Sequence, residues 1–457
     1  MLIDTHCHLD FKDFDNDRDS VIARAKAAGV ARIVNVASSV EGSSRSVELA
    51  RDHDIIYASV GVHPHDAKIV TDEIIENLRA IALSHKKVVA IGEVGLDYYR
   101  NLSPKDIQIE AFRKFIRLAA ELKLPLILHA REAEGDILKV LKEEARKLHV
   151  KAVMHCFSGG MPFLKECLDM GFYLSFTANL TFKNAKDLRV VAKAVPVERL
   201  FIETDAPFLA PEKLRGKRNE PSYLVYLIEE WSRILGLSQE DIARITTHNA
   251  NQFFGLGLED RSKIAYEIRD SLYLNITNRC TNMCDFCVRS QTEFVKGHNL
   301  KLEGEPTIEE ILDAVGNPAK YKEVVFCGYG EPTLRLDVIK AVSRAIKKQG
   351  AKIRVVTNGH GDIINGHTIA NDLAGLVDRF SVSLNTDTSS KYNDICKPEF
   401  GPDTYGRILD FIRSLVHSGI EVEVTCLDLP GVDIKRCEAI AREMGVKFRL
   451  RSLGVVG

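Results

Sequence analysis

Several features that would place this chain in other classes of protein are absent from its sequence. No uninterrupted apolar run is long enough to cross a bilayer, so we predict no transmembrane helix. The opening segment MLIDTHCHLD lacks a basic flank followed by an apolar stretch, so we do not expect a signal peptide. Both absences favour a cytoplasmic protein without membrane association.

Disulfide frameworks and a strong excess of one charge are also missing. The ten cysteines are scattered, and only Cys280, Cys284 and Cys287 lie close together. In a long cytosolic chain such a cluster indicates a metal site and not disulfides. The formal net charge of −2 argues against a large generic surface for nucleic acid. A polyanionic substrate would therefore need bound cations or local arginine and lysine side chains.

No low-complexity segment is present, and no dinucleotide-binding glycine fingerprint follows the first expected strand, which disfavours a Rossmann fold. The sequence instead alternates short apolar runs with amphipathic segments, the pattern of parallel strands joined by helices. A hydrophobic content of 45% with 28% charged residues is typical of globular proteins. At 457 residues, two domains are expected.

The order of expected strands defines the two domains. The first half contains eight: MLIDTH, RIVNVAS, IIYASVGV, VVAIGEVG, PLILHA, AVMHCF, FYLSFT and LFIETD. The second half contains six: SLYLNIT, EVVFCGYG, KIRVVTNG, RFSVSLN, EVEVTCLD and KFRLRSL. We predict an α/β protein with a (β/α)₈ TIM-type barrel in residues 1–258, a short charged linker in 259–270 and a partial (β/α)₆ barrel in 271–457.

Histidine and carboxylate residues stand at the ends of the first eight strands. They are Asp4, His6, His8, His63, His65, Glu93, His129, His155 and Asp205. Active sites of such barrels lie at the C-terminal ends of the strands, so we expect these side chains to converge. Strand side chains repeat every two residues, which places His6 and His8 on the same face. Unconnected polar residues would be the alternative, but six ligand-type residues that each stand at a strand end make it unfavourable.

We take six of these residues as the candidate metal ligands: His6, His8, Glu93, His129, His155 and Asp205. They are too many for one catalytic ion that must keep an open position, so we expect two divalent ions bridged by Glu93. Imidazole with carboxylate suits Zn²⁺, Mn²⁺, Fe or Ni, whereas Mg²⁺ prefers more oxygen. Two such ions can activate a water and stabilise the attacking and leaving oxygens of a phosphoryl displacement.

Eight segments resemble the TatD family of metal-dependent nucleases: IDTHCHLD, GVHPHDA, IGEVGLDYYR, LPLILHARE, MHCFSGG, SFTANLTFKNA, ETDAPFLAP and RGKRNEPSYL. The resemblance runs from Met1 to about Leu258. It implies 3′→5′ exonuclease or other phosphodiesterase action on DNA, with RNA as a further substrate, dependent on Mg, Mn or Zn ions. It also implies that Asp205 accepts the proton of the attacking water, that His63 and Arg131 meet the substrate phosphate, and that the loop 215–221 shapes the rim.

Cys280, Cys284 and Cys287 directly follow the strand SLYLNIT. Three thiolates can hold three irons of a [4Fe-4S] cluster and leave the fourth iron open for a small ligand. A structural zinc site with three cysteines and one histidine is the alternative. The compact loop itself contains no histidine, and His298 lies some distance away along the chain.

The spacing CxxxCxφC, with Phe286 before the last cysteine, resembles the radical SAM superfamily. The segment GYGEP at the next strand end resembles that family's glycine/glutamate element. The resemblance implies reductive cleavage of S-adenosylmethionine to methionine and a 5′-deoxyadenosyl radical, with an electron donor such as flavodoxin or ferredoxin. The residues that it implies as cofactor contacts are Gly328, Gly330, Glu331, Asn358 and Ser383.

The sequence thus predicts a bifunctional enzyme, a metal-dependent phosphodiesterase fused to a radical SAM domain. In the alternative, the first site hydrolyses an ester or amide, such as an aminoacyl linkage on tRNA. The second domain would then hold its cluster for a redox or structural role. A shared chain suggests a shared pathway, but this is an association and not a physical argument.

Overall fold

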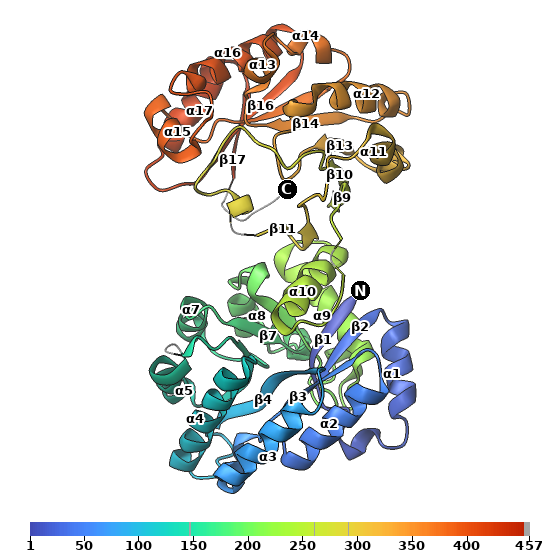
Figure 1. The fold of residues 1–457 in the computed structure, drawn as a ribbon, viewed down its shortest axis with the longest axis vertical. Coiled ribbons are helices and arrows are strands. Elements are labelled where there is room, and N and C mark those ends of the chain that lie inside the picture. The colour runs from blue at the N-terminus through green and yellow to red at the C-terminus, as the bar shows by residue number, and fades with distance from the viewer. Residues whose placement is uncertain (146–147, 260, 291, 452–457) are drawn as a thin grey trace. The chain divides into compact units, whose positions relative to one another are not determined.

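The computed structural model describes residues 1–145, 148–259, 261–290 and 292–451. The chain divides into two units, Met1–Glu259 and Asp260–Gly457, each built around its own sheet (Figure 1). Within the described ranges, no helix combines the length and the apolar content that a membrane span requires.

The first unit is a barrel of eight parallel strands in sequential order. The strands are β1 (Leu2–Cys7), β2 (Val30–Asn35), β3 (Ile56–Val60), β4 (Val88–Asp97), β5 (Leu126–Arg131), β6 (Ala152–Met154), β7 (Tyr173–Phe176) and β8 (Leu200–Ile202). An isolated bridge between Cys7 and Ala206 brings the last strand back to the first. The predicted TIM-type barrel is therefore confirmed.

Helices surround these strands (Figure 1). They are α1 (Arg18–Ala27), α2 (Val40–Asp52), α3 (Asp72–Leu83), α4 (Lys105–Leu122), α5 (Glu134–Val140), α7 (Met161–Asp169), α8 (Lys186–Lys193), α9 (Leu224–Leu235) and α10 (Gln239–Phe254). Local chemistry fixes several starts, because the side chains of Ser39, Thr71 and Ser238 accept hydrogen bonds from the first turns of α2, α3 and α10.

Two apolar clusters hold the barrel together. The larger one packs the apolar faces of the helices on the strands and contains Phe112, Phe115 and Trp231. A second cluster joins the end of α10, through Phe253 and Phe254, to several strands. Burying each such aromatic side chain stabilises the fold by roughly 1.5–3 kcal/mol.

The second unit contains a seven-stranded sheet in the order β17-β16-β15-β14-β13-β10-β9. Its strands are β9 (Ala265–Ile268), β10 (Ser271–Leu274), β13 (Glu323–Phe326), β14 (Ile353–Thr357), β15 (Arg379–Ser383), β16 (Glu421–Leu427) and β17 (Lys447–Arg451). The six strands predicted from the sequence are parallel. β9 pairs antiparallel with β10, so part of the segment expected as a linker, 259–270, forms an edge strand.

One face of this sheet is covered by helices (Figure 1). They are α11 (Ile308–Val315), α12 (Leu336–Lys347), α13 (Gly361–Asn365), α14 (Ala370–Leu373), α15 (Ser389–Cys396), α16 (Thr404–His417) and α17 (Ile434–Glu443). Alternate strand residues such as Leu272, Phe326 and Val424 are buried under them. A small hairpin, β11 (Phe294–Val295) and β12 (His298–Asn299), follows the cysteine loop.

Candidate metal centres

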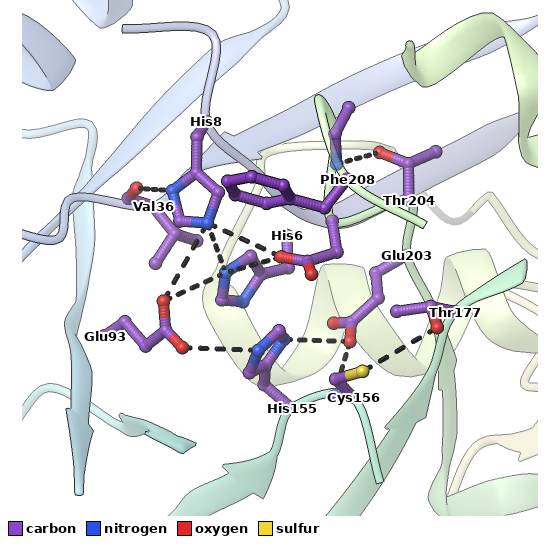
Figure 2. Close-up of polar contacts among 12 residues, drawn as sticks. His6, His8, Val36, Glu93, His155, Cys156, Thr177, Glu203, Thr204 and Phe208 are labelled. Carbon is purple, nitrogen blue, oxygen red and sulfur yellow. Dashed lines mark hydrogen bonds and ion pairs between the residues drawn. The ribbon is translucent and has the colours of Figure 1, made fainter. Parts of the chain in front are cut away.

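Glu93, in β4, directs its two carboxylate oxygens at two different groups of side chains (Figure 2). Oε2 lies 3.6 Å from Nε2 of His6 and 3.8 Å from Nε2 of His8. Oε1 lies 2.8 Å from Nδ1 of His129 and 3.3 Å from Nε2 of His155. In each group the candidate ligand atoms lie within 4.8 Å of one another. One carboxylate therefore joins two adjacent sites that could each hold an ion.

Asp205, just after β8, completes the first of these groups. Its Oδ1 lies 3.5 Å from Nε2 of His8 and 3.7 Å from Nε2 of His6. Its backbone adopts a φ of 57°, a left-handed conformation that aspartate visits more readily than most residues. Asp4 behaves differently, because its carboxylate accepts hydrogen bonds from the backbone and hydroxyl of Thr204 and ties β1 to β8.

His6 is the most enclosed imidazole. Its ring stacks on that of His155 with 3.7 Å between centroids, and its Nδ1 has no hydrogen-bond partner among the described residues. Its Nε2 lies 3.2 Å from Nε2 of His8, whose Nδ1 donates to the carbonyl of Val36 at 2.7 Å. Two ring nitrogens this close in a buried space are suited to sharing one cation.

Two further carboxylates orient the imidazoles of the second group. Nδ1 of His155 lies 3.0 Å from Oε1 of Glu203, and Nε2 of His129 lies 3.0 Å from Oδ2 of Asp97. In both rings the other nitrogen faces Glu93. A hydrogen bond on the far nitrogen is characteristic of metal-binding histidines, because it fixes the tautomer and the direction of the lone pair.

Burial and charge act in opposite directions at this centre. Burial would raise the pKa of Glu93, but the imidazoles of His155, His63 and His129 outweigh it and hold that pKa well below its usual value. Burial would lower the pKa of His155, but the carboxylates of Glu203 and Glu93 hold it well above its usual value. Anionic charge is thus concentrated in a buried space, where a bound cation would neutralise it.

A pocket opens over these two groups of candidate ligands, and both charged and aromatic side chains line it. Its lining includes Arg131, whose guanidinium carbon is 3.9 Å from the ring centroid of the exposed Tyr99. It also includes Phe208, which is 51% exposed and lies beside Phe11. His63 lines the pocket with its Nε2 3.6 Å from Oε1 of Glu93, and burial lowers its pKa to about 3.

The arginines of the basic loop 215–221 contact residues outside the pocket. Arg218 forms two hydrogen bonds with Asp17, at 2.7 and 2.8 Å, and Arg215 lies over the ring of Phe182. None of the loop's residues belongs to the lining described for the pocket. These basic side chains therefore fasten the loop to the barrel, and the rim role expected for them stays a prediction.

The three cysteines lie in the loop after β10, where each is half-buried: Cys280, Cys284 and Cys287. The guanidinium of Arg289 interacts with all three thiols. It also donates to the carbonyls of Asn278 at 3.0 Å and Asn282 at 3.1 Å, which fixes it to the loop. A cation fixed to the cysteine loop fits the ligation of an anionic cluster, since the thiols must lose their protons to bind iron.

The glycine-rich segment after β13 packs closely on the start of the cysteine loop. A Cβ atom at Gly328 would lie 2.1 Å from Oδ1 of Asn275, and one at Gly330 would lie 2.2 Å from the carbonyl oxygen of Arg279. The N–H of Glu331 donates to that same carbonyl at 2.7 Å. Glycine is needed at both positions because no side chain fits between the two segments.

The buried carboxylate of Glu331 is occupied by protein donors. It accepts hydrogen bonds from the hydroxyls of Thr357 at 2.8 Å and Thr333 at 2.6 Å, and from the N–H of Asn358 at 2.7 Å. The side-chain nitrogen Nδ2 of Asn358 lies 3.9 Å from Sγ of Cys280. Glu331 thus positions Asn358 next to the cysteine loop, and its own contact with a cofactor stays a prediction.

The contacts described for Ser383 and His298 are with residues other than the three cysteines. Oγ of Ser383, at the end of β15, lies 3.5 Å from Oγ1 of Thr425. Nε2 of His298 lies 3.2 Å from the carbonyl oxygen of Glu267, and its ring centroid is 5.0 Å from that of Tyr266. His298 therefore packs on β9, which gives no support to a zinc site completed by this residue.

A buried polar chain supports the cysteine loop from behind. Oγ1 of Thr281 lies 2.7 Å from Nδ1 of His360, and Nε2 of the same ring lies 2.9 Å from the hydroxyl of Tyr392. The side-chain amide of Asn282 donates to that hydroxyl at 2.9 Å. Two loop residues between the first and second cysteines are therefore held by a network that burial makes costly to break.

Family models match both units. The one described as TatD related DNase matches residues 3–255, over half of the chain. The chain belongs to this family. A second model, described as Radical SAM superfamily, matches residues 274–444. Both resemblances predicted from the sequence are therefore confirmed, and the chain is a TatD domain followed by a radical SAM domain.

Relatives of the TatD domain are similar over nearly their whole length. The uncharacterized metal-dependent hydrolase YabD of Bacillus subtilis (strain 168) is 48% identical over 254 residues, which are 56% of this chain and 99% of that protein. The 3′-5′ ssDNA/RNA exonuclease TatD of Cronobacter sakazakii is 38% identical over 258 residues, 55% of this chain and 97% of the relative.

Solved structures share the fold of this domain. The TatD homologue YjjV of Escherichia coli K12 has a TM-score of 0.53 and 29% identity over 56% of this chain and 98% of that chain. A TatD-family hydrolase of Entamoeba histolytica has a TM-score of 0.52 and 24% identity over 55% of this chain and 97% of its own. The second likeness supports the fold alone.

The structure adds residues that we did not predict for either domain. In the TatD domain they are Asp97 and Glu203, and in the radical SAM domain Arg289. The period of two along a strand could have revealed Asp97, which follows Glu93 by four residues in β4. Glu203 and Asp205 both lie beyond the end of β8, so this period does not apply to them. No comparable signal pointed to Arg289.

Proposed function

We propose that the TatD domain, residues 1–258, is a divalent-metal-dependent phosphodiesterase that removes nucleotides from the 3′ end of single-stranded DNA, with RNA as a further substrate. The observation that carries this proposal is the division of the two Glu93 oxygens between two groups of ligand atoms. The donor set fits two divalent ions, since imidazoles and carboxylates of both groups converge in a buried space. A relative named as a 3′-5′ ssDNA/RNA exonuclease supports the substrate class.

The roles we assign follow from position. His6, His8 and Asp205 would hold one ion, His129 and His155 the other, with Glu93 between them. When bound, such ions activate a water and neutralise charge on the phosphate. Asp205 faces the pocket. Burial would raise its pKa, but the hydrogen bond and charge of His8 outweigh burial and lower that pKa. Asp205 therefore stays ionised and can accept the proton of that water.

The walls of the pocket match the two parts of a nucleotide. Arg131 offers a guanidinium that can bind phosphate oxygens in a bidentate manner, and His63 lies deeper with a neutral ring that can donate to the same phosphate. Phe208 and Phe11, which line the same pocket, present an aromatic surface on which a base can stack.

The decisive experiment compares single-stranded oligonucleotides labelled at the 3′ or the 5′ end, with Mg²⁺, Mn²⁺ or Zn²⁺ added in turn. We expect early release of labelled mononucleotide from the 3′-labelled strand only. Arg131→Ala should raise KM for the oligonucleotide more than it lowers kcat. Failure to release nucleotides with any of the three ions, together with hydrolysis of an aminoacyl ester, would replace this proposal with the esterase alternative.

We further propose that residues 271–457 bind a [4Fe-4S] cluster through Cys280, Cys284 and Cys287 and cleave S-adenosylmethionine. When bound, the cluster and the cofactor would supply a 5′-deoxyadenosyl radical that abstracts hydrogen from a substrate. Arg289 would offset the charge of the thiolates, and Asn358 lies near enough to Cys280 to contact a ligand of the cluster. A flavodoxin or ferredoxin would deliver the electron. Gly328, Gly330, Glu331 and Ser383 are the further contacts we assign.

Anaerobic reconstitution with iron and sulfide tests this second activity. We expect about four irons per chain in the cluster and formation of 5′-deoxyadenosine when a strong reductant and S-adenosylmethionine are added. A fully loaded cluster that yields no 5′-deoxyadenosine would instead favour a redox or structural role for the domain.

A further inference from the structure

The face of the second sheet that points away from the helices carries a row of charged residues. Register pairs Arg354 with Arg379 and Thr425 with Arg449, so these side chains share one face. Since strand residues alternate, Arg451 lies on this face as well, at the end of β17. The helix-covered face, in contrast, holds the apolar alternates of the same strands.

Most charges on this inner face are paired. Glu323 accepts from Arg354, whose nearest nitrogen is 2.8 Å away, and from Arg379 at 2.8 Å. Glu423 forms an ion pair with Arg449, with 3.1 Å between its carboxylate oxygen and Nε. Two glutamates therefore pair with three arginines. Lys447, the first residue of β17, forms a separate ion pair with Glu421.

Arg451 is the exception. Its Nε is buried and has no hydrogen-bond partner, and no carboxylate lies within ion-pair distance of it in the part of the chain that the structure describes. Arg449 stands two residues before it on the same face. Through β15 and β16, the register places both arginines on the face of the sheet that also carries Arg354 and Arg379. Arg451 as a whole is half-buried, so a ligand that supplies the opposite charge can reach a guanidinium that has no carboxylate partner.

We propose that Arg451, with Arg449 beside it, binds an oxyanion group, phosphate or carboxylate, of the molecule on which the radical SAM domain acts. The inference rests on the proposed function of that domain and names its substrate class. A guanidinium recognises such groups through two parallel hydrogen bonds. The site lies at the carboxyl end of β17, and the carboxyl ends of parallel strands, including β10 with its cysteine loop, share one edge of the sheet.

The test measures modification of Arg451 itself by phenylglyoxal, mapped by mass spectrometry on the cluster-loaded full chain without oxygen. Probes are inorganic pyrophosphate and citrate, added with saturating S-adenosylmethionine. We expect either probe to slow the modification of Arg451 at least fivefold in a saturable way. Arg413, which is exposed on α16, should react at an unchanged rate. Protection by pyrophosphate alone would assign a phosphate, and protection by citrate alone a carboxylate.

Variants on the same strand sharpen the result. Arg449→Gln should raise the probe concentration for half-protection of Arg451 about tenfold. Lys447→Gln, at an exposed position of β17, is the matched control and should leave it unchanged. An unaltered rate with both probes would overturn the inference, as would full protection by S-adenosylmethionine alone.

The same preparation is assayed for 5′-deoxyadenosine, which separates the two proposals. If the nucleoside forms and the probes give no protection, only the oxyanion site is wrong. If no nucleoside forms from a loaded cluster, the proposed radical activity is wrong, whatever the probes do at Arg451.

Discussion

At the residue scale, Glu203 and Asp97 orient the imidazoles of two candidate metal ligands. Each holds the far nitrogen of one imidazole, so that the near nitrogen faces Glu93 with its lone pair. A ring free to rotate would lose this direction, and the affinity for an ion would fall.

We therefore expect Glu203→Gln to weaken metal binding about 10- to 100-fold while leaving the fold intact, because the amide keeps an acceptor for His155 but loses the charge. Isothermal titration with Mn²⁺ measures this. Glu229→Gln, which removes an exposed partner of Lys213, is the matched control. Equal affinity in Glu203→Gln and the parent protein would show that the negative charge of Glu203 does not contribute to metal binding.

His360, behind the cysteine loop, couples the stability of the radical SAM domain to pH. Burial lowers its pKa to about 4, against about 6.5 in the unfolded chain. Below pH 6.5 the unfolded state therefore binds the proton first, and the folded state loses stability as the pH falls toward 4. The loss across this window is about 3 kcal/mol.

Urea unfolding of the second domain at pH 7 and pH 4.5 checks this expectation. The variant His360→Asn is less stable at pH 7 because it breaks the contacts to Thr281 and Tyr392. Its stability should nevertheless fall less between the two pH values than that of the parent chain. An equal fall in both proteins would assign the pH dependence to other groups.

At the element scale, the segment after β13 and the cysteine loop behave as one unit, because their backbones touch. Gly330→Ala would place a methyl group 2.2 Å from the carbonyl oxygen of Arg279, so one of the two segments must move. We expect a loss of about 1–3 kcal/mol in the stability of the second domain and a lower iron content after reconstitution.

The control for this variant is Gly406→Ala, in the helix α16. A Cβ atom there meets nothing within 4 Å, so the change should raise stability by about 0.5–1 kcal/mol through helix propensity alone. Urea unfolding and iron analysis of both variants decide the matter. Normal iron loading in Gly330→Ala would mean that the two segments are not coupled.

At the scale of the whole molecule, the two centres lie in separate units with separate sheets. Glu93→Gln should lower phosphodiesterase activity about 1,000-fold, because it removes the charge shared by both ion sites, and should leave cluster assembly unchanged. Cys284→Ala should abolish 5′-deoxyadenosine formation and leave the hydrolysis intact. Loss of both activities in either folded variant would mean that the centres depend on each other.

Much of this organisation could be read from the sequence. All eight strands of the barrel and the six parallel strands of the second sheet were predicted, because their apolar runs are separated by clear helical patterns. The candidate ligands were found because they stand at strand ends. The edge strand β9 was not predicted, because Ala265–Ile268 is short, lies in a charged stretch and pairs with β10 alone.

The sequence by itself determined which residue types stand at the strand ends, and so the kind of chemistry each unit can support. Only the tertiary structure decided how they are shared: which Glu93 oxygen faces which imidazoles, that Glu331 is satisfied by protein donors, and that Arg451 has no carboxylate beside it in the described chain. The reason is physical. A residue's period along its own strand fixes the face on which it lies, whereas its partners come from other strands, through curvature and register that no local pattern encodes.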